Sequence, residues 1–429
     1  MGHGNGFRPV IGLALSTFVA TTLTLTLPVR ADGPAVGRPK AKGGDLVATP
    51  ETAVAEGNNR FAFDLYARLR GGPGNLFFSP YSIASALAMT AAGARGETER
   101  QVANALHVSV KQADRDAGFK ALIDRLNNAG DAPAARVDTL VSANALWLQK
   151  GEPFLPAFLD AATQKYSASA FDVDFADNPE AARKAINAWV ENQTADKIKN
   201  LVGPADVTPT TALVLTNAIY FKGAWLHPFS PGATDKEGVF TNRDGKKTTT
   251  ALMIQSESYR HFDGGTFQVL ELPYTGNRRA LLVVLPKALD GLSALEPALT
   301  PEVLDGWSQG LKTRRVNLQL PKFRVEEAFQ LSDTLKALGI VDAFDASRAD
   351  FSGMTGSRDR AISAVIHKAF VDVNESGTEA AAASAVVMMR TSAIRPEPPV
   401  DFKADHPFLF LIRDQATGAV LFLGRVETL

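Results

Sequence analysis

The sequence predicts a single domain of the α+β class. Helical patterns cluster in the first half of the chain and strand-like runs in the second, without the regular strand–helix alternation that a doubly wound parallel sheet requires. The 429 residues are 45% hydrophobic and 21% charged, which is the composition of a globular domain with a large core. No internal repeat and no interior linker indicates a second domain.

The first residues have the pattern of an export signal. Arg8 supplies a positive charge, the run Val10–Leu27 is mostly apolar, and Val29-Arg30-Ala31 offers small residues for cleavage. A membrane anchor is the alternative, but serine and several threonines interrupt the apolar run. We therefore expect secretion, to the extracellular space or a periplasm, and three parts of the chain: a signal peptide at 1–31, a flexible linker at 32–50 and a folded domain at 51–429.

Three helices are predicted from their apolar spacing and end signals. Phe61, Leu65 and Leu69 recur at helical spacing, and Ser79 followed by Pro80 is typical of a capped first turn. The second helix is rich in small apolar residues, which suits burial against a sheet. The predicted helices span Glu56–Arg70, Ser79–Gly93 and the residues that follow Asn178-Pro179.

Apolar, β-prone runs predict the strands. These runs are Leu213–Tyr220, Ala280–Leu285, Val316–Leu320, Ala364–Val373, Phe408–Arg413 and Ala419–Val426. The last two are joined across Asp414–Gly418 and therefore predict a hairpin of mostly buried strands.

Composition argues against several classes of function. The 45 Lys and Arg residues balance the 46 Asp and Glu residues, so no global field attracts nucleic acid or an anionic membrane. The chain has no cysteine and its six histidines show no ligand spacing, so we expect no metal and no other cofactor. Two basic clusters are interpreted as solvated strand ends, with a polyanion site as the alternative: Lys312 with Arg314 and Arg315, and Arg278-Arg279.

One segment, Gly377–Ser392, fits neither a core helix nor an ordinary strand. It begins with small residues, becomes apolar and β-prone, and is followed by prolines that end any helix or central strand. At period two, Thr378 begins a face of small or apolar residues, and Glu379 lies on the opposite face. The segment would extend roughly 50 Å, so it could remain a loop outside a sheet or slide between two strands. An alanine-rich helix over Thr378–Arg390 is the alternative, and composition alone favours it.

This segment and its flank His367–Glu375 resemble the reactive-centre loop and hinge of serpins. Further motifs resemble the same family and follow its order along the chain: Asn75–Ile83, Gly93–Thr98, Leu215–Trp225, Leu320–Phe323, Asp350–Met354, Ala404–Phe410 and Phe422–Val426. The resemblance covers roughly Ala55 to the C-terminus. It implies a single-domain serpin fold in which helices surround three β-sheets and the reactive-centre loop is exposed.

The resemblance also implies roles for individual residues. The polar cluster where the main sheet opens would be Ser79, Ser82, Asn217 and His367. The pair at the start of insertion would be Glu375 and Lys322, beside Trp225, and we expect the loss of one partner to be costly. The loop hinge, kept outside the sheet, would be Gly377, Thr378, Glu379, Ala380, Ala381, Ala382, Ala383, Ser384 and Ala385.

A protease inhibitor, and not an enzyme, is the implied function. A serine protease would cut the loop and form an acyl-enzyme, and the freed loop would insert as a strand and carry the protease with it. The small inward-facing residues of the hinge predict an active inhibitor that is consumed in the process. We also expect the protein to be a monomer. We expect the scissile bond at Thr391-Ser392, which suits elastase-like or subtilisin-like enzymes. Arg390-Thr391, which suits a trypsin-like enzyme, is the alternative, and Met389 is a third choice.

Two other functions remain as alternatives. A non-inhibitory serpin, such as a carrier or a chaperone, would have the same fold. A hydrolase is disfavoured because the chain has neither a GxSxG turn nor a GxxxxGK[ST] loop. Asn192-Gln193-Thr194 and Asn374-Glu375-Ser376 have the form of glycosylation sequons, but a glycan at the second would block insertion.

Overall fold

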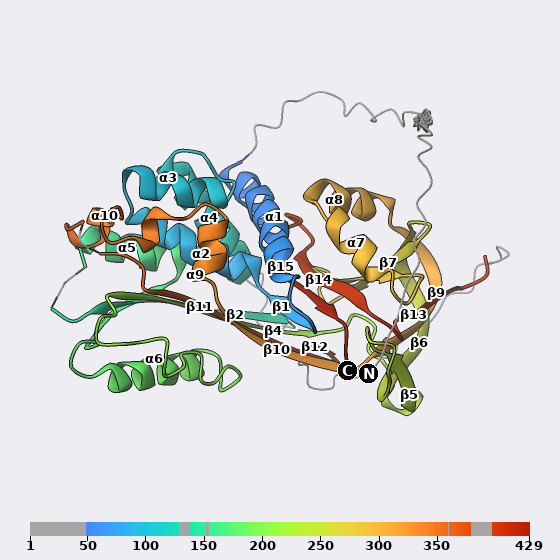
Figure 1. The fold of residues 1–429 in the computed structure, drawn as a ribbon. Helices are drawn as coiled ribbons and strands as arrows, with labels where there is room; N and C mark the ends of the chain where they lie inside the picture. The colour runs from blue at the N-terminus through green and yellow to red at the C-terminus, as the bar shows by residue number, and fades with distance from the viewer. Residues whose placement is uncertain (1–48, 128–137, 152–153, 359, 379–396) are drawn as a thin grey trace, which may run out of the picture. The chain divides into compact units, whose positions relative to one another are not determined.

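The computed structural model describes residues 49–127, 138–151, 154–358, 360–378 and 397–429, which lie within one compact unit, Ala48–Leu429. Helices and two mixed β-sheets form the layers of this unit (Figure 1). The prediction of an α+β fold is confirmed.

The α-helices of the described residues are mostly in the first half of the chain. They are α1 (Pro50–Leu69), α2 (Pro80–Ala92), α3 (Gly96–Ala105), α4 (Gln112–Asn127), α5 (Pro156–Tyr166), α6 (Pro179–Gln193), α7 (Leu292–Leu295), α8 (Pro301–Gly310), α9 (Ser332–Ala337) and α10 (Ser352–Thr355). Short 3-10 turns are η2 (Pro231–Ala233), η3 (Glu296–Ala298) and η4 (Asp342–Phe344). The three helices predicted from the sequence correspond to α1, α2 and α6. Helix α1 begins earlier than expected because the Thr49 side chain caps it by accepting a hydrogen bond from the Thr52 amide.

A six-stranded sheet has the strand order β10-β11-β12-β4-β2-β3. Its strands are β2 (Asp138–Gln149), β3 (Ser169–Val173), β4 (Leu213–Ala224), β10 (Phe323–Gln330), β11 (Ala364–Asn374) and β12 (Gly377–Thr378). Strands β11 and β4 also pair directly and in parallel, from Ala364 opposite Val214 to Phe370 opposite Tyr220. Beyond that point the short β12 lies between them and is antiparallel to both.

A second sheet has the order β1-β15-β14-β8-β7-β6-β9-β13, and β5 pairs with β6. Its strands are β1 (Leu76–Phe78), β5 (Asp235–Thr241), β6 (Lys247–Asp263), β7 (Phe267–Pro273), β8 (Arg279–Pro286), β9 (Lys312–Pro321), β13 (Val400–Lys403), β14 (Phe408–Asp414) and β15 (Val420–Val426). The resemblance implied three sheets, whereas the described strands form two because the long β6 pairs with β9, β7 and β5.

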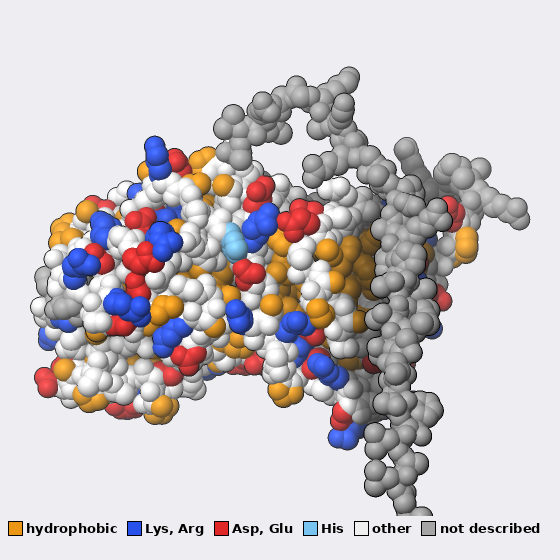
Figure 2. Space-filling view, turned by 45° about the horizontal axis from the view of Figure 1, so that its top comes forward, with side chains coloured by type: hydrophobic (Ala, Val, Ile, Leu, Met, Phe, Trp, Pro, Cys, Tyr) orange, Lys and Arg blue, Asp and Glu red, His pale blue; other side chains and the backbone are white. Residues whose placement is uncertain are grey.

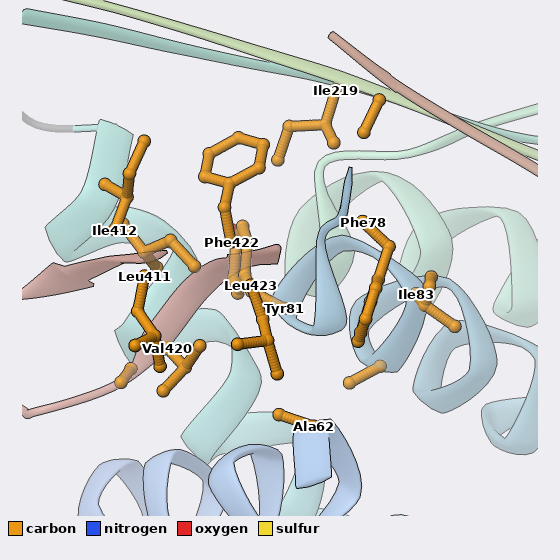
Figure 3. Close-up of a cluster of buried hydrophobic side chains, with 14 of the residues drawn as sticks. Ala62, Phe78, Tyr81, Ile83, Ile219, Leu411, Ile412, Val420, Phe422 and Leu423 are labelled. Atoms are coloured by element: carbon orange, nitrogen blue, oxygen red, sulfur yellow. The ribbon is translucent and has the colours of Figure 1, made fainter. Parts of the chain in front are cut away.

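Helix α2 lies at the centre of the core. The Ser79 side chain caps it by accepting from the Ser82 amide, and every residue of the helix is buried. Figure 3 shows Tyr81 of this helix beside Val420, Phe422 and Leu423 of β15, and Ile83 beside Phe78 of β1. The expected burial of α2 against a sheet is confirmed. On the other face of the six-stranded sheet, α6 packs Ile186 and Val190 against β2, β4 and β11 (Figure 1).

The surface carries both signs of charge. On the face in Figure 2, Lys and Arg side chains lie among Asp and Glu side chains, without a large area of one sign. Lys312 and Arg314 are exposed, as expected for solvated strand ends. The same interpretation of Arg279 is wrong, because its side chain is only 1% exposed and pairs with Asp138. Over the described residues, no helix combines the length and the apolar character that a membrane span needs.

Candidate functional site

Three polar residues lie in one row across the six-stranded sheet. His367 of β11 is opposite Asn217 of β4, and Asn217 is opposite Asn144 of β2. His367 and Asn217 are 0% and 1% exposed. Because β11 and β4 pair directly here, any strand that entered between them would have to break this row.

The contacts of His367 define its protonation state. The backbone amide of Ser79 donates to His367 Nε2 at 3.1 Å, so this nitrogen carries no proton. The other nitrogen, Nδ1, therefore donates to the side-chain oxygen of Asn217. Burial lowers the pKa of His367 from 6.5 to about 3, although the hydrogen bond with Asn217 acts in the opposite direction. His367 is consequently a neutral imidazole at physiological pH.

The two serines of the predicted cluster complete the network. Asn217 Nδ2 donates to Ser82 Oγ at 2.5 Å and also to the side-chain oxygen of Asn144. The hydroxyl of Ser79 donates to the carbonyl of Leu421 on β15 at 2.6 Å. The structure therefore brings together all four residues predicted from the resemblance. Sequence reasoning missed Asn144, since it did not predict the strand that carries it.

The first two hinge residues already lie in the sheet, contrary to the expectation that the hinge stays outside. Thr378 pairs with Val373 on one side and with Gly223 on the other. It is 0% exposed, and its hydroxyl lies 2.7 Å from the hydroxyl of Tyr274. Gly377 approaches β4 so closely that an added Cβ would lie 2.0 Å from the Gly223 carbonyl oxygen. Only glycine fits at this entry position.

Lys322, Glu375 and Trp225 meet beside this entry. Lys322 Nζ lies 2.9 Å from Glu375 Oε2, and Thr234 donates to Glu375 Oε1 at 3.0 Å. Burial acts to raise the pKa of Glu375, but these hydrogen bonds outweigh it and the pKa is lowered. The Trp225 indole donates to the carbonyl of Asn374 at 2.9 Å, which fixes the turn between β11 and β12.

The rest of the predicted loop lies outside the described residues. This applies to the hinge residues Glu379, Ala380, Ala381, Ala382, Ala383, Ser384 and Ala385 and to both scissile-bond choices, Thr391-Ser392 and Arg390-Thr391. The chain is described again from Glu397, and β13 then pairs in parallel with β9. The candidate site within the described residues thus consists of the short strand β12 and the polar row of Asn144, Asn217 and His367.

Comparisons with known proteins identify the family. A family model described as serpin, a serine protease inhibitor, matches residues 56–429. Human Serpin B3 is 41% identical over 397 residues, covering 88% of this chain and 99% of the relative. The bovine leukocyte elastase inhibitor is 41% identical over 385 residues, covering 87% of this chain and 99% of the relative.

The fold is also similar to a solved serpin structure. Human thyroxine-binding globulin, solved with bound thyroxine, is 32% identical with a TM-score of 0.80, and the match covers 89% of this chain and 99% of that chain. The matched family is one of inhibitors and not of catalysts, as predicted for this chain. The family match spans almost all of the described residues. The chain belongs to the serpin family.

Proposed function

We propose that this chain is a secreted inhibitor of serine proteases that traps its target by inserting its cut loop between β11 and β4. The protease serine attacks the carbonyl carbon of the scissile bond, the new amine of the following residue leaves, and an acyl-enzyme remains on the loop. Insertion of the freed loop then distorts the attached protease before water releases it. Each inhibitor molecule acts once.

The docked hinge is the observation that carries this proposal. Strand β12 occupies the first two positions of a strand that would run antiparallel to β11 and β4. If the same register continued, Glu379 would lie opposite Lys222, whose side chain is exposed. Ser384 would lie opposite Asn217 and His367, which are polar partners for its hydroxyl. The charged and polar hinge residues would thus meet solvent and hydrogen-bonding groups, and the alanines would enter the close-packed interior.

The proposed target is an elastase-like or subtilisin-like protease. A scissile bond at Thr391-Ser392 presents a threonine, which suits a small or apolar specificity pocket. The named leukocyte elastase inhibitor among the relatives supports this choice. Cleavage at Arg390 by a trypsin-like enzyme is the alternative. Mass spectrometry of the C-terminal peptide released by each class of protease would identify the bond.

Secretion rests on the N-terminal sequence alone. The apolar run Val10–Leu27 and the small residues ending at Ala31 support cleavage of a signal peptide. We expect the mature protein recovered from the culture medium or periplasm to begin at Asp32. Retention of the full chain inside the producing cell would contradict this part of the proposal.

The trap can be tested by exchanging two neighbouring hinge residues. In the double variant Glu379→Ala with Ala380→Glu, the carboxylate moves to a position opposite Phe221 and Val371, both 1% exposed. Burial of an unpaired carboxylate opposes insertion. We expect the variant to be cut without forming a stable covalent complex, and its stoichiometry of inhibition to rise at least ~10-fold.

The single variant Glu379→Ala is the matched control, because it removes the same charge without placing it in the interior. It should trap the protease as the unmodified chain does. Equal trapping by the exchanged variant would exclude insertion in this register. Absence of any complex with elastase-like, subtilisin-like and trypsin-like enzymes would favour a binding role, such as the one that the name of thyroxine-binding globulin gives for that protein.

A further inference from the structure

A buried ion pair outside the polar row joins Asp138 to Arg279. Arg279 Nη1 lies 2.8 Å from Asp138 Oδ1, and the two side chains are 1% and 5% exposed. Within the described ranges, Asp138 Oδ2 and Arg279 Nε have no hydrogen-bond partner. Such a pair adds little net stability, because the loss of hydration offsets the attraction. The role of this ion pair is therefore inferred from its position in the fold and not from its contribution to stability.

Asp138 lies in one row with the hinge. It is the first residue of β2 and pairs with Gly223 of β4. Gly223 pairs on its other side with Thr378, the buried hinge residue. A shift of Asp138 would therefore move Gly223, the β4 residue that pairs with the hinge residue Thr378.

Arg279 reaches the hinge by a second route. Its backbone carbonyl accepts a hydrogen bond from the Tyr274 amide at 3.0 Å. The Tyr274 hydroxyl lies 2.7 Å from the hydroxyl of Thr378, and its ring stacks on Trp225 with centroids 4.7 Å apart. The same arginine thus supports both the strand opposite the hinge and the side chain that holds the hinge hydroxyl.

The far end of this contact chain is helix α4. Arg279 Nη2 donates to the carbonyl of Leu126 at 2.5 Å, and Arg278 Nη2 donates to the carbonyl of Arg125 at 2.7 Å. Both carbonyls belong to the last turn of α4, where backbone acceptors lack partners within the helix. The end of α4 is therefore tied through Arg279 to the start of β2 and to β8.

We propose that Arg279 and Asp138 are positioning residues that keep the hinge docked between β4 and β11. They act on the hinge through Gly223 and Tyr274. The pair holds Thr378 in the sheet, at the position where the strand proposed above begins. Any effect on inhibition rests on the trapping mechanism proposed above, whereas docking of the hinge is a property of the uncut protein.

Packing alone is the competing explanation. The guanidinium carbon of Arg279 lies 5.8 Å from the centre of the Phe221 ring, so the side chain also fills the core. A residue that only filled space would affect the stability of the whole sheet and not the hinge in particular. The two explanations therefore predict different patterns of amide exchange.

Hydrogen exchange of the uncut, full-length protein distinguishes them. The variant Asp138→Asn keeps the shape of the side chain and removes its charge. We expect the β12 amides to exchange at least ~10-fold faster. Peptides from the directly paired parts of β11 (Ala364–Phe370) and β4 (Val214–Tyr220) should keep their protection. Tyr274→Phe, which removes only the hydroxyl bonded to Thr378, should produce the same local change.

A second buried pair provides the control. Arg425 Nη1 lies 2.8 Å from Glu296 Oε1, with side chains 1% and 5% exposed, so it matches the first pair in burial and geometry. Glu296→Gln should leave β12 exchange unchanged. If Asp138→Asn fails to fold, Arg279→Lys retains the charge and shortens the reach to Leu126, and the same local increase is expected.

Unchanged β12 exchange in a folded Asp138 or Arg279 variant would overturn the proposal, and so would a uniform increase over the whole sheet. Because no protease is present, neither result depends on whether the chain traps one. If the protein does not inhibit any protease but its Asp138 variant shows faster exchange of the β12 amides alone, the proposed function is contradicted. The positioning role of Asp138 and Arg279 is then still supported.

Discussion

His367 is a single residue whose buried imidazole makes the stability of the six-stranded sheet depend on pH. Its folded pKa is about 3, below the ordinary value of 6.5. The unfolded chain therefore binds a proton between these values that the folded chain does not, so folding is favoured fully above pH 6.5 and less as the pH falls. We expect this residue to remove about 1.4 kcal/mol of unfolding free energy per pH unit below pH 6.5.

Urea unfolding at pH 7.5 and pH 5 measures this loss. The variant His367→Gln should show a pH dependence smaller by roughly 2 kcal/mol over this interval. His107→Gln, which removes an exposed histidine, is the control. An unchanged slope in the His367 variant would mean that His367 is protonated in the folded state.

Solvent exposure limits the contribution of the Lys322–Glu375 ion pair to the free energy of unfolding. The sequence led us to expect a costly loss, but the Lys322 side chain is 41% exposed and the Glu375 side chain 15%. Solvent screens such a pair. We predict that Lys322→Met lowers the unfolding free energy by less than ~1 kcal/mol, measured by urea denaturation at pH 7.5. A loss several times larger would show that the pair acts as a buried one.

At the scale of the element, β12 depends on Gly377. An added Cβ would clash with the Gly223 carbonyl oxygen, and the φ of +150° is also unfavourable for other residues. Gly377→Ala should therefore displace β12 from the sheet, and its amides should exchange at least ~10-fold faster. Gly71→Ala is the control, since nothing lies within 4 Å of a Cβ at that position. Retained protection in the Gly377 variant would show that the hinge docks by another path.

At the scale of the molecule, the proposed mechanism requires the uncut protein to lack a strand that it can accept. An inserted loop would add a ladder of hydrogen bonds on both sides and bury small apolar side chains, on the order of 10 kcal/mol together. We predict that cutting the loop raises the midpoint of thermal unfolding by more than ~10 °C. Differential scanning calorimetry before and after cleavage measures the change.

The exchanged hinge variant serves as the control for this experiment as well. Its loop can be cut but should not insert, so its unfolding midpoint should stay near that of the uncut chain. An equal rise in both proteins would assign the stabilisation to cleavage itself and not to the added strand.

Part of this architecture could be predicted from local sequence. The apolar spacing before Leu69, the Ser79-Pro80 cap and the hairpin around Asp414–Gly418 each depend on residues close together in the chain, and each prediction is confirmed. The family motifs also predicted the polar cluster, whose members come from helix α2 with its cap and from strands β4 and β11. Helix α4 and strand β2 were not predicted, and Asn144 was missed with β2.

The sequence by itself determined that this chain has an alanine-rich segment beside serpin motifs, because side-chain size and charge along one segment are local properties. Only the tertiary structure decided that Gly377 and Thr378 are already in the sheet and that Arg279 is buried against Asp138. The physical reason is that burial and strand pairing depend on partners more than a hundred residues away, such as Tyr274 for Thr378 and Asp138 for Arg279. No local pattern specifies those partners.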